Sequence, residues 1–267
     1  MKPVKLNLRR GVYVVPTTLT ILNVFFGFRS MLYSMKAIEA IASGKPVGVI
    51  EAAFETACLS ILFAAIFDTF DGLVARQLGA TSEFGKEYDS LADVVTFGAA
   101  PAVLVYAWGL NVLEKLGGGI AFLFLAAVSL RLARFNVQTG KTDYRYFVGL
   151  PSPAGALTLA AMIFYTPAPV KDRSFAFMVL AVTAATAFSM VSPIRYRSQK
   201  GLNLQKERSL MYFVVFAAII GLAFYWPREF WFLGAVLYLL SGPIVKLWSI
   251  AFPRKVEEEV VAPVETP

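Results

Sequence analysis

Long apolar runs, rather than a regular alternation of polar and apolar positions, dominate this chain. Eight segments approach the roughly 20 predominantly apolar residues that a membrane-spanning helix needs. Stretches containing Gly and Pro, which favour turns, separate several of them. The pattern therefore predicts an all-α integral membrane protein with about eight transmembrane helices. These are expected over 15–35, 49–70, 88–108, 117–137, 150–168, 174–193, 209–226 and 229–250.

The apolar segments follow one another without a linker or an internal repeat, so we expect a single membrane-embedded domain over 1–252. Residues 5–15 mix arginine with apolar side chains, which fits either an N-terminal interfacial amphipathic helix or the start of the first span. Residues 253–267 are acidic and poor in aromatic residues. Such a composition predicts a disordered cytoplasmic tail.

The composition agrees with a membrane protein and narrows the chemistry. The chain is 57% hydrophobic and only 16% charged. It has no histidine, which excludes histidine bases, histidine metal ligands and the Ser/His triad. Acid–base chemistry must therefore use Asp, Glu, Lys or Tyr. The single cysteine, Cys58, has no second cysteine with which to form an internal disulfide, and we expect a packed thiol.

The basic residues predict the orientation in the membrane. Most of the 25 Lys and Arg residues fall in the termini and in alternate connections, which places them on one side of an eight-helix topology. Cationic loops face the cytoplasm. The net charge of +7 fits contact with anionic lipid headgroups. Because this charge is scattered over membrane loops, we expect no nucleic-acid partner.

Four aspartates and one arginine interrupt the apolar pattern. Asp68, Asp71 and Arg76 end one predicted span, and Asp89 and Asp93 open the next. A charge at bilayer depth costs roughly 2.5–3.5 kcal/mol on the mildest scale. Four neighbouring carboxylates also repel one another. Bound cations are the simplest means of holding such a cluster ionised.

Helical spacing gathers these side chains on two faces. Asp68, Gly72 and Arg76 are four residues apart, as are Asp89 and Asp93, so each set shares a face. The turn around Gly79 predicts a helical hairpin with its acidic faces opposed. Oxygen ligands suit Mg²⁺, Mn²⁺ or Ca²⁺, and an arginine beside small residues suits a phosphate or pyrophosphate substrate. One arginine cannot neutralise four carboxylates, which argues against a purely structural charge network.

The motif DxxDGxxARx8GxxxDxxxD, which begins at Asp68, is complete in this chain. It resembles the signature of the CDP-alcohol phosphatidyltransferases. Further stretches are similar to the phosphatidylserine synthase branch of that family. They are Ser90-Leu-Ala-Asp-Val-Val-Thr-Phe-Gly-Ala-Ala-Pro-Ala102, Arg131-Leu-Ala-Arg-Phe-Asn136, Gly149-Leu-Pro-Ser-Pro153 and Met190-Val-Ser-Pro-Ile-Arg-Tyr-Arg197.

This resemblance implies that CDP-diacylglycerol and L-serine react to give phosphatidylserine and CMP. It also implies two divalent cations, Mg²⁺ or Mn²⁺, a homodimer, and a multi-pass location in the cytoplasmic membrane. Asp93 would act as the general base. The implied metal ligands are Asp68, Asp71, Asp89 and Asp93, and the implied CDP-binding residues are Gly72, Ala75, Arg76 and Gly85.

Arg131 and Arg134 share a helical face at the end of the fourth predicted span. They could hold the lipid phosphate or the serine carboxylate, or they could snorkel to headgroups and set the topology. Asn136 and Ser152 are further candidates for positioning serine.

Two polar residues of the first span have no assigned role. Asn23 could contact the nucleotide or a neighbouring helix. Arg29 could pair with Glu51 or Glu55 near the start of the second span.

Two alternatives stay open at this point. The first keeps the chemistry but changes a substrate, with glycerol 3-phosphate or inositol as acceptor, or an archaeal-type CDP-lipid as donor. The second is a cation transporter with intramembrane aspartates. Transporters typically show inverted repeats or broken helices in matching halves, and we see neither in this sequence.

Overall fold

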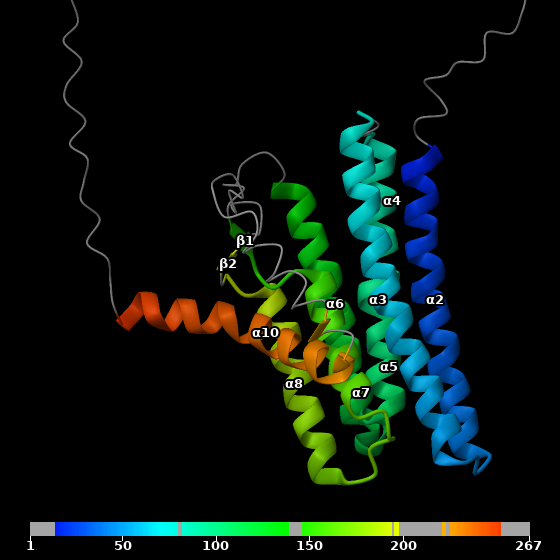
Figure 1. Cartoon of the computed structure of the whole chain (residues 1–267). Coiled ribbons are helices and arrows are strands. Elements are labelled where there is room, and N and C mark those ends of the chain that lie inside the picture. Colours follow the sequence, from blue (N-terminus) through cyan, green and yellow to red (C-terminus); the bar gives the residue numbers. More distant parts are fainter. Residues whose placement is uncertain are drawn as a thin grey trace, which may run out of the picture.

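A computed structural model describes residues 14–79, 82–138, 146–193, 195–197, 221–222 and 225–251. The expected N-terminal amphipathic helix and the expected tail over 253–267 lie almost wholly outside these residues. Most of the helices stand side by side in a bundle (Figure 1). Their bounds are α2 Val14–Ala42, α3 Val47–Gln77, α4 Glu83–Asp93, α5 Ala100–Trp108, α6 Glu114–Gln138, α7 Ser152–Tyr165, α8 Arg173–Val191 and α10 Pro227–Ala251.

The pattern of α2 is inverted relative to a helix of a water-soluble protein. Small and polar residues recur every three or four positions and are buried, while large apolar residues face outward. Small residues let transmembrane backbones approach closely. The buried positions are Pro16, Thr20, Asn23, Gly27, Ser30, Ser34, Ala37 and Ala40.

The chain reverses at Gly44, where φ is 61°, and α3 then packs against α2 along its length. Positive φ is a conformation that glycine adopts without strain. Thr96 approaches this pair of helices at Gly27, where an added Cβ would lie 2.6 Å from the Thr96 hydroxyl oxygen. This position therefore requires glycine.

The third membrane helix is continuous but irregular. It consists of α4, a π-helical turn over Val94–Ala99 (η1) and α5. A 3-10 turn over Leu110–Leu113 (η2) leads to α6. Single π turns within α-helices occur frequently at functional sites.

Two short strands join loops that are far apart in the sequence. Strand β1 (Tyr146–Val148) pairs antiparallel with β2 (Arg195–Arg197), with Phe147 opposite Tyr196. The pair connects the segment after α6 to the segment after α8, and so ties the ends of these two helices together (Figure 1).

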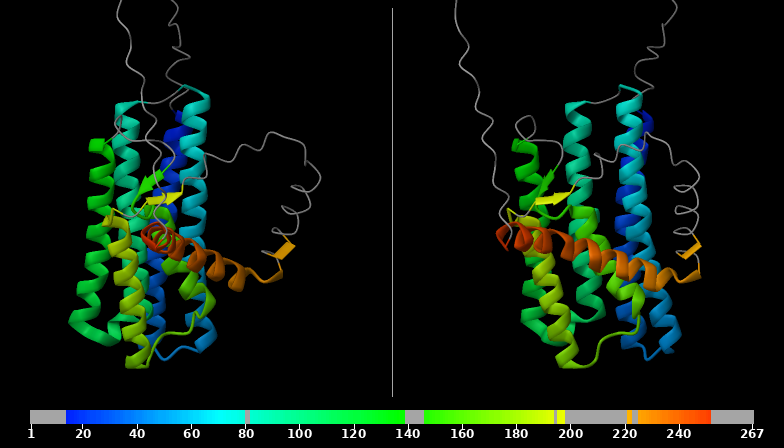
Figure 2. Two further views of the ribbon diagram at one scale, coloured as in Figure 1. Left: turned by 90° about the vertical axis from the view of Figure 1, so that its left-hand side faces the viewer. Right: turned by 60° about the vertical axis from the view of Figure 1, so that its left-hand side comes forward.

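Helix α10 runs across the bundle instead of along it (Figures 1 and 2). Its first turn is joined to α3 by an ion pair between Arg228 and Glu55. Aromatic contacts then hold it against α7, with ring centroids 5.2 Å apart for Phe164 and Trp231. We expected Arg29 to pair with Glu51 or Glu55. In the structure Glu55 pairs with Arg228, and Arg29 donates a hydrogen bond of 3.0 Å to Ser60.

The chain is a multi-pass membrane protein, but the predicted number of eight spans is too high. Within the described ranges, six helical segments are long and apolar enough to cross a membrane. The segment expected over 150–168 forms α7, which has 14 residues and reaches about 21 Å, short of a bilayer core of roughly 30 Å. The span expected over 209–226 lies largely outside the described residues.

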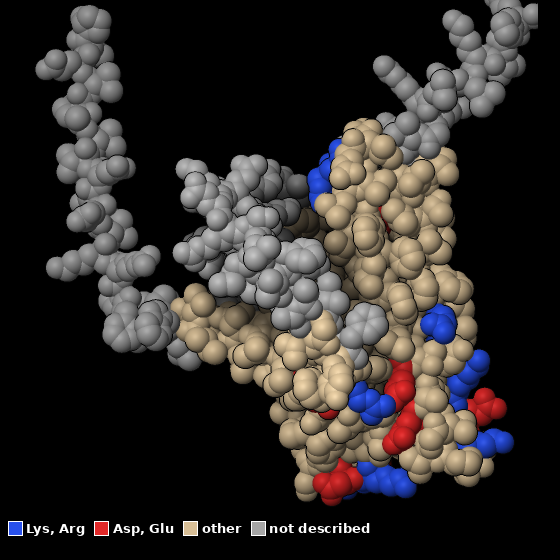
Figure 3. All heavy atoms as spheres, in the orientation of Figure 1, with Lys and Arg blue, Asp and Glu red and all other residues tan. Residues whose placement is uncertain are grey.

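The described surface is largely apolar, which fits helices that lie in a membrane. In Figure 3, charged side chains gather mainly at the lower end of the visible face, and most of the remaining described surface is neither acidic nor basic. Large apolar side chains on α2, α3 and α6 are exposed, as in Phe25, Phe63 and Phe122. In water such exposure would be costly, so a lipid surrounding accounts for it.

Candidate active site

Three of the four predicted aspartates form one compact cluster. Asp68 and Asp71 lie on α3 and Asp89 lies on α4, and one oxygen of each lies within 4.8 Å of the other two. Ser82 caps α4 by accepting a hydrogen bond of 3.0 Å from the Gly85 amide, which fixes where this helix begins. The expected hairpin therefore opposes the acidic faces of α3 and α4.

Asp71 is the most buried member, with 5% of its surface exposed. The hydroxyl group of Thr20, from α2, donates a hydrogen bond of 2.9 Å to one oxygen of Asp71. Such a contact fixes the direction in which the carboxylate presents its other lone pairs. Three helices thus define the cluster.

The cluster fits a hard divalent cation. The Oδ1 atom of Asp89 is buried and has no hydrogen-bond partner among the described residues. A buried carboxylate oxygen without a partner is costly unless a cation or water satisfies it. Oxygen ligands held this close to one another are the donors that Mg²⁺ and Mn²⁺ prefer.

Asp93 stands one helical turn beyond this cluster, next to the π turn η1. Its carboxyl group lies close enough to those of Asp68, Asp89 and Asp71 for charge repulsion among them. Its Oδ1 atom is buried and, within the described part of the chain, has no hydrogen-bond partner. The predicted set of four carboxylates is therefore arranged as three together and one adjoining.

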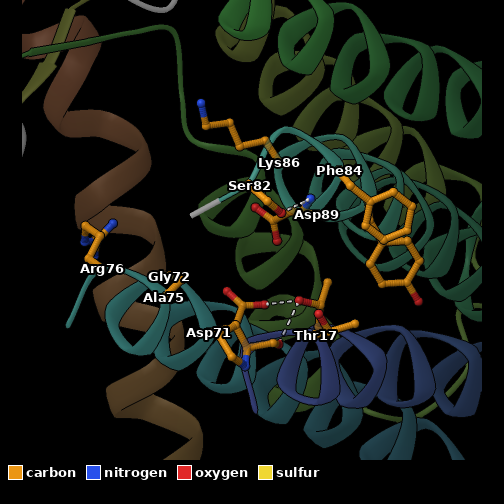
Figure 4. A pocket seen from close by; sticks show the side chains of 13 residues that line it. Thr17, Asp71, Gly72, Ala75, Arg76, Ser82, Phe84, Lys86 and Asp89 are labelled. Carbon is orange, nitrogen blue, oxygen red and sulfur yellow. Dashed lines mark hydrogen bonds between the residues drawn. The ribbon is translucent and has the colours of Figure 1, made fainter. Parts of the chain in front are cut away.

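A pocket of about 170 Å³ opens beside the cluster, between the ends of α2, α3 and α4. This is several times the roughly 30 Å³ that one water occupies in the liquid, so part of a larger ligand can enter. Figure 4 shows Asp71 and Asp89 facing each other in it, with Arg76 on one side and Phe84 on the other. The lining includes all four residues predicted for the CDP moiety, which are Gly72, Ala75, Arg76 and Gly85.

Gly72 leaves the wall of this pocket open. An added Cβ would meet only the Arg76 Nη1 atom, at 3.7 Å. At Gly85, by contrast, an added Cβ would lie 3.1 Å from the Ser82 hydroxyl oxygen that caps α4. A side chain at Gly72 would therefore occupy ligand space, whereas one at Gly85 would also disturb the helix start.

Arg131 lies on α6. It is 9% exposed, and its Nη1 atom donates a hydrogen bond of 3.2 Å to the hydroxyl group of Ser152. It is near enough to Asp93 for an attractive charge interaction, while its Nε atom has no hydrogen-bond partner among the described residues. A buried guanidinium with a spare donor is suited to a carboxylate or phosphate.

Arg134 and Asn136 make hydrogen bonds to residues other than the clustered aspartates. The Nη1 atom of Arg134 donates a hydrogen bond of 3.1 Å to the carbonyl oxygen of Val191, the last residue of α8. The side-chain amide of Asn136 donates to the hydroxyl group of Ser90 at 3.0 Å. The contact of Arg134 is one that a basic residue makes at a helix C-terminus.

Sequence reasoning did not assign to the site the seven pocket residues outside the signature positions, which are Pro16, Thr17, Thr20, Ser82, Phe84, Lys86 and Tyr88. Thr17 and Thr20 approach from α2, and Phe84 and Tyr88 from α4. The signal for Thr20 was present, because it belongs to the row of polar and small residues that recurs every three or four positions along α2. No such pattern marks Phe84.

Comparison with known proteins bears on this geometry. The profile of the CDP-alcohol phosphatidyltransferase family matches residues 13–192. This range covers α2 to α8 and includes both halves of the aspartate hairpin.

Individual relatives carry related names. A CDP-diacylglycerol–serine O-phosphatidyltransferase of Helicobacter pylori is 30% identical over 241 residues, which cover 87% of this chain and 91% of the relative. An archaetidylserine synthase of Methanothermobacter thermautotrophicus is 34% identical over 191 residues, 71% of this chain and 72% of the relative. A CDP-diacylglycerol–serine O-phosphatidyltransferase of Bacillus subtilis is 36% identical over 158 residues, 57% of this chain and 82% of the relative.

Proposed function

The chain belongs to the CDP-alcohol phosphatidyltransferase family, and from this premise we propose that it transfers a phosphatidyl group from CDP-diacylglycerol to the hydroxyl group of L-serine. The products are phosphatidylserine and CMP. The observation that carries the proposal is the place of Asp93. It lies within range of a charge interaction both with Asp68 of the carboxylate cluster and with the buried Arg131. One carboxyl group thus adjoins both the aspartate cluster beside the CDP pocket and Arg131, which we assign below to serine.

The reaction replaces one phosphate ester by another. The serine hydroxyl oxygen forms a bond to the phosphorus atom of the phosphatidyl group, and the bond between that phosphorus and the oxygen of CMP breaks. The serine hydroxyl is a weak nucleophile until a base accepts its proton. We assign this role to Asp93, because the chain has no histidine and the oxygens of Asp68, Asp71 and Asp89 face one another.

The same carboxylates account for the cofactor. We assign two divalent cations, Mg²⁺ or Mn²⁺, to Asp68, Asp71 and Asp89, with Asp93 as a further ligand. Bound there, such cations would neutralise the diphosphate and stabilise the charge that develops on departing CMP. Thr20 orients Asp71 for this task, and Gly72, Ala75, Arg76 and Gly85 receive the CDP moiety beside it.

Arg131 is our assignment for the serine carboxylate. Its burial removes the competition of water, and Ser152 holds one side of the guanidinium. A carboxylate bound to the remaining donors would bring the serine hydroxyl toward Asp93. Arg134 is engaged with the end of α8, so we assign it a supporting role in place of direct contact with serine or the lipid phosphate.

Serine as acceptor is also supported by the relatives, since the names of all three contain serine while the lipid part differs between them. We further propose a homodimer, one domain over 1–252, and a site that faces the cytoplasm. The orientation rests on the sequence, in which most Lys and Arg residues fall in the termini and in alternate connections, among them the one between α3 and α4.

The test is an assay of lipid products with a panel of substrates. Protein purified in detergent receives CDP-diacylglycerol or an archaeal-type CDP-lipid, with serine, glycerol 3-phosphate or inositol. Mass spectrometry of the products should find phosphatidylserine from CDP-diacylglycerol and serine. A product from another alcohol alone would reassign the acceptor, and a product from the archaeal-type lipid alone would reassign the donor. No product from any pair, in folded protein, would contradict the proposed function.

A further inference from the structure

Two aromatic residues on α4 form one wall of the pocket and have no part in the assignments above. Phe84 and Tyr88 are four residues apart, so they share a face of the helix. Their rings are nearly parallel, with an interplanar angle of 2° and centroids 6.2 Å apart. Parallel rings at this separation are offset, which leaves ring face uncovered for another flat group.

Phe84 is unusually placed for so large an apolar side chain. It is 73% exposed and lies in the first turn of α4, among the polar residues Ser82, Glu83 and Lys86. The acyl chains of a lipid substrate have to extend toward the apolar middle of the bilayer, away from this end of the bundle. The water-soluble end of the substrate is therefore the part that comes near Phe84.

The aromatic and the charged side chains occupy different parts of the pocket. Figure 4 shows Phe84 on the opposite side of Asp71 and Asp89 from Arg76. Both Phe84 and Tyr88 line the same pocket as these two carboxylates. A ligand with its diphosphate at the carboxylate cluster therefore has a flat aromatic surface within the same pocket, beyond the charged groups.

We propose that the offset rings of Phe84 and Tyr88 form a stacking platform for the cytosine base of the CDP substrate. This inference rests on the proposed function, since it needs a nucleotide in the pocket. Stacking of a base on an aromatic side chain is favourable and tolerates imperfect alignment, because the whole ring face takes part. Phe84 and Tyr88 would then be binding residues for the nucleotide, next to the signature positions.

The experiment compares inhibition by CMP and by ribose 5-phosphate, which has the sugar phosphate but no base. Phe84→Leu keeps an apolar side chain and removes the ring. We expect the inhibition constant for CMP to rise at least about fivefold, while that for ribose 5-phosphate stays unchanged. Phe84→Tyr should restore the wild-type value, and Tyr88→Leu should weaken CMP binding in the same selective way.

Leu91→Ala is the matched control, because Leu91 is 67% exposed on the same helix and does not line the pocket. It should leave both inhibition constants unchanged. Equal CMP inhibition in Phe84→Leu and wild type would overturn the platform and leave the proposed function intact. Equal weakening of both inhibitors would overturn it too, since that points to a general change of the pocket. A wild-type protein that turns over no CDP-lipid and binds no CMP would overturn both proposals.

Discussion

The hydroxyl group of Thr20 donates a hydrogen bond of 2.9 Å to the carboxylate of Asp71, across 51 residues of sequence. The contact joins α2 to the aspartate hairpin of α3 and α4. It also places a neutral donor on a carboxylate that, in the proposed metal site, would present its remaining lone pairs to a cation. Partners of this kind commonly change metal affinity or activity by about 10- to 100-fold when removed.

Thr20→Val should therefore lower the affinity for the metal without changing the shape of the pocket. Valine has nearly the shape of threonine but donates no hydrogen bond. We expect the Mg²⁺ concentration that gives half-maximal activity to rise about tenfold. The control is Thr18→Val, because Thr18 is on the same helix and donates only to the carbonyl oxygen of Val14. Equal Mg²⁺ requirements in the two variants would show that Thr20 does not orient Asp71.

Asp93→Asn should separate binding from turnover. Asparagine preserves the size of the side chain but cannot accept the serine proton as a carboxylate does. We expect CMP binding to persist while turnover falls by about 10²- to 10⁴-fold. Asp71→Asn is the comparison, since it removes a member of the compact cluster and should reduce metal-dependent CMP binding as well. A similar loss of binding in both variants would assign Asp93 to metal ligation alone.

Arg131 and Arg134 should behave differently although they are three residues apart on one helix. Arg131→Lys keeps the charge but loses the forked donor geometry. We expect the KM for serine to rise at least tenfold while the KM for CDP-diacylglycerol is unchanged. Ser152→Ala, which removes the partner of Arg131, should give a smaller rise in the same constant.

Arg134→Ala should instead reduce stability, by about 1 kcal/mol, because it removes a hydrogen bond to the end of α8. A thermal unfolding measurement in detergent checks this change alongside serine kinetics. If Arg134→Ala raised the KM for serine and Arg131→Lys did not, the assignment of the acceptor site would have to be reversed.

Gly72→Ala should obstruct the nucleotide. The added methyl group would stand in pocket space, with only the Arg76 side chain near it. We expect the KM for CDP-diacylglycerol to rise about tenfold, with the KM for serine little changed. Gly48→Ala is the matched control on the same helix, because an added Cβ there meets nothing within 4 Å. A normal KM in Gly72→Ala would place the nucleotide elsewhere in the pocket.

Much of this arrangement could be predicted from the sequence where short-range spacing decides it. Residues four apart share a helical face, so the opposed aspartates followed from the sequence together with the turn at Gly79. Apolar length likewise gave the positions of α2, α3, α6 and α8. The roles of individual site residues stay predictions until the variants above are measured.

What could not be predicted depends on contacts between distant segments. The course of α10 across the bundle is fixed by Arg228 on Glu55 and by rings of α7, and none of these contacts leaves a local pattern. The count of spans failed for a related reason, since apolar composition does not tell a 14-residue helix such as α7 from a full span. The contact of Thr20 with Asp71 is equally invisible to periodicity.

The most direct test of the central claim is the release of CMP from CDP-diacylglycerol by the purified chain. We expect release that depends on serine, that requires Mg²⁺ or Mn²⁺, and that EDTA abolishes. Asp71→Asn should reduce CMP release sharply. Excess metal should restore the activity of wild-type protein that has been treated with EDTA. Undiminished release in EDTA after exhaustive metal removal, or no release with serine from folded protein, would contradict the account.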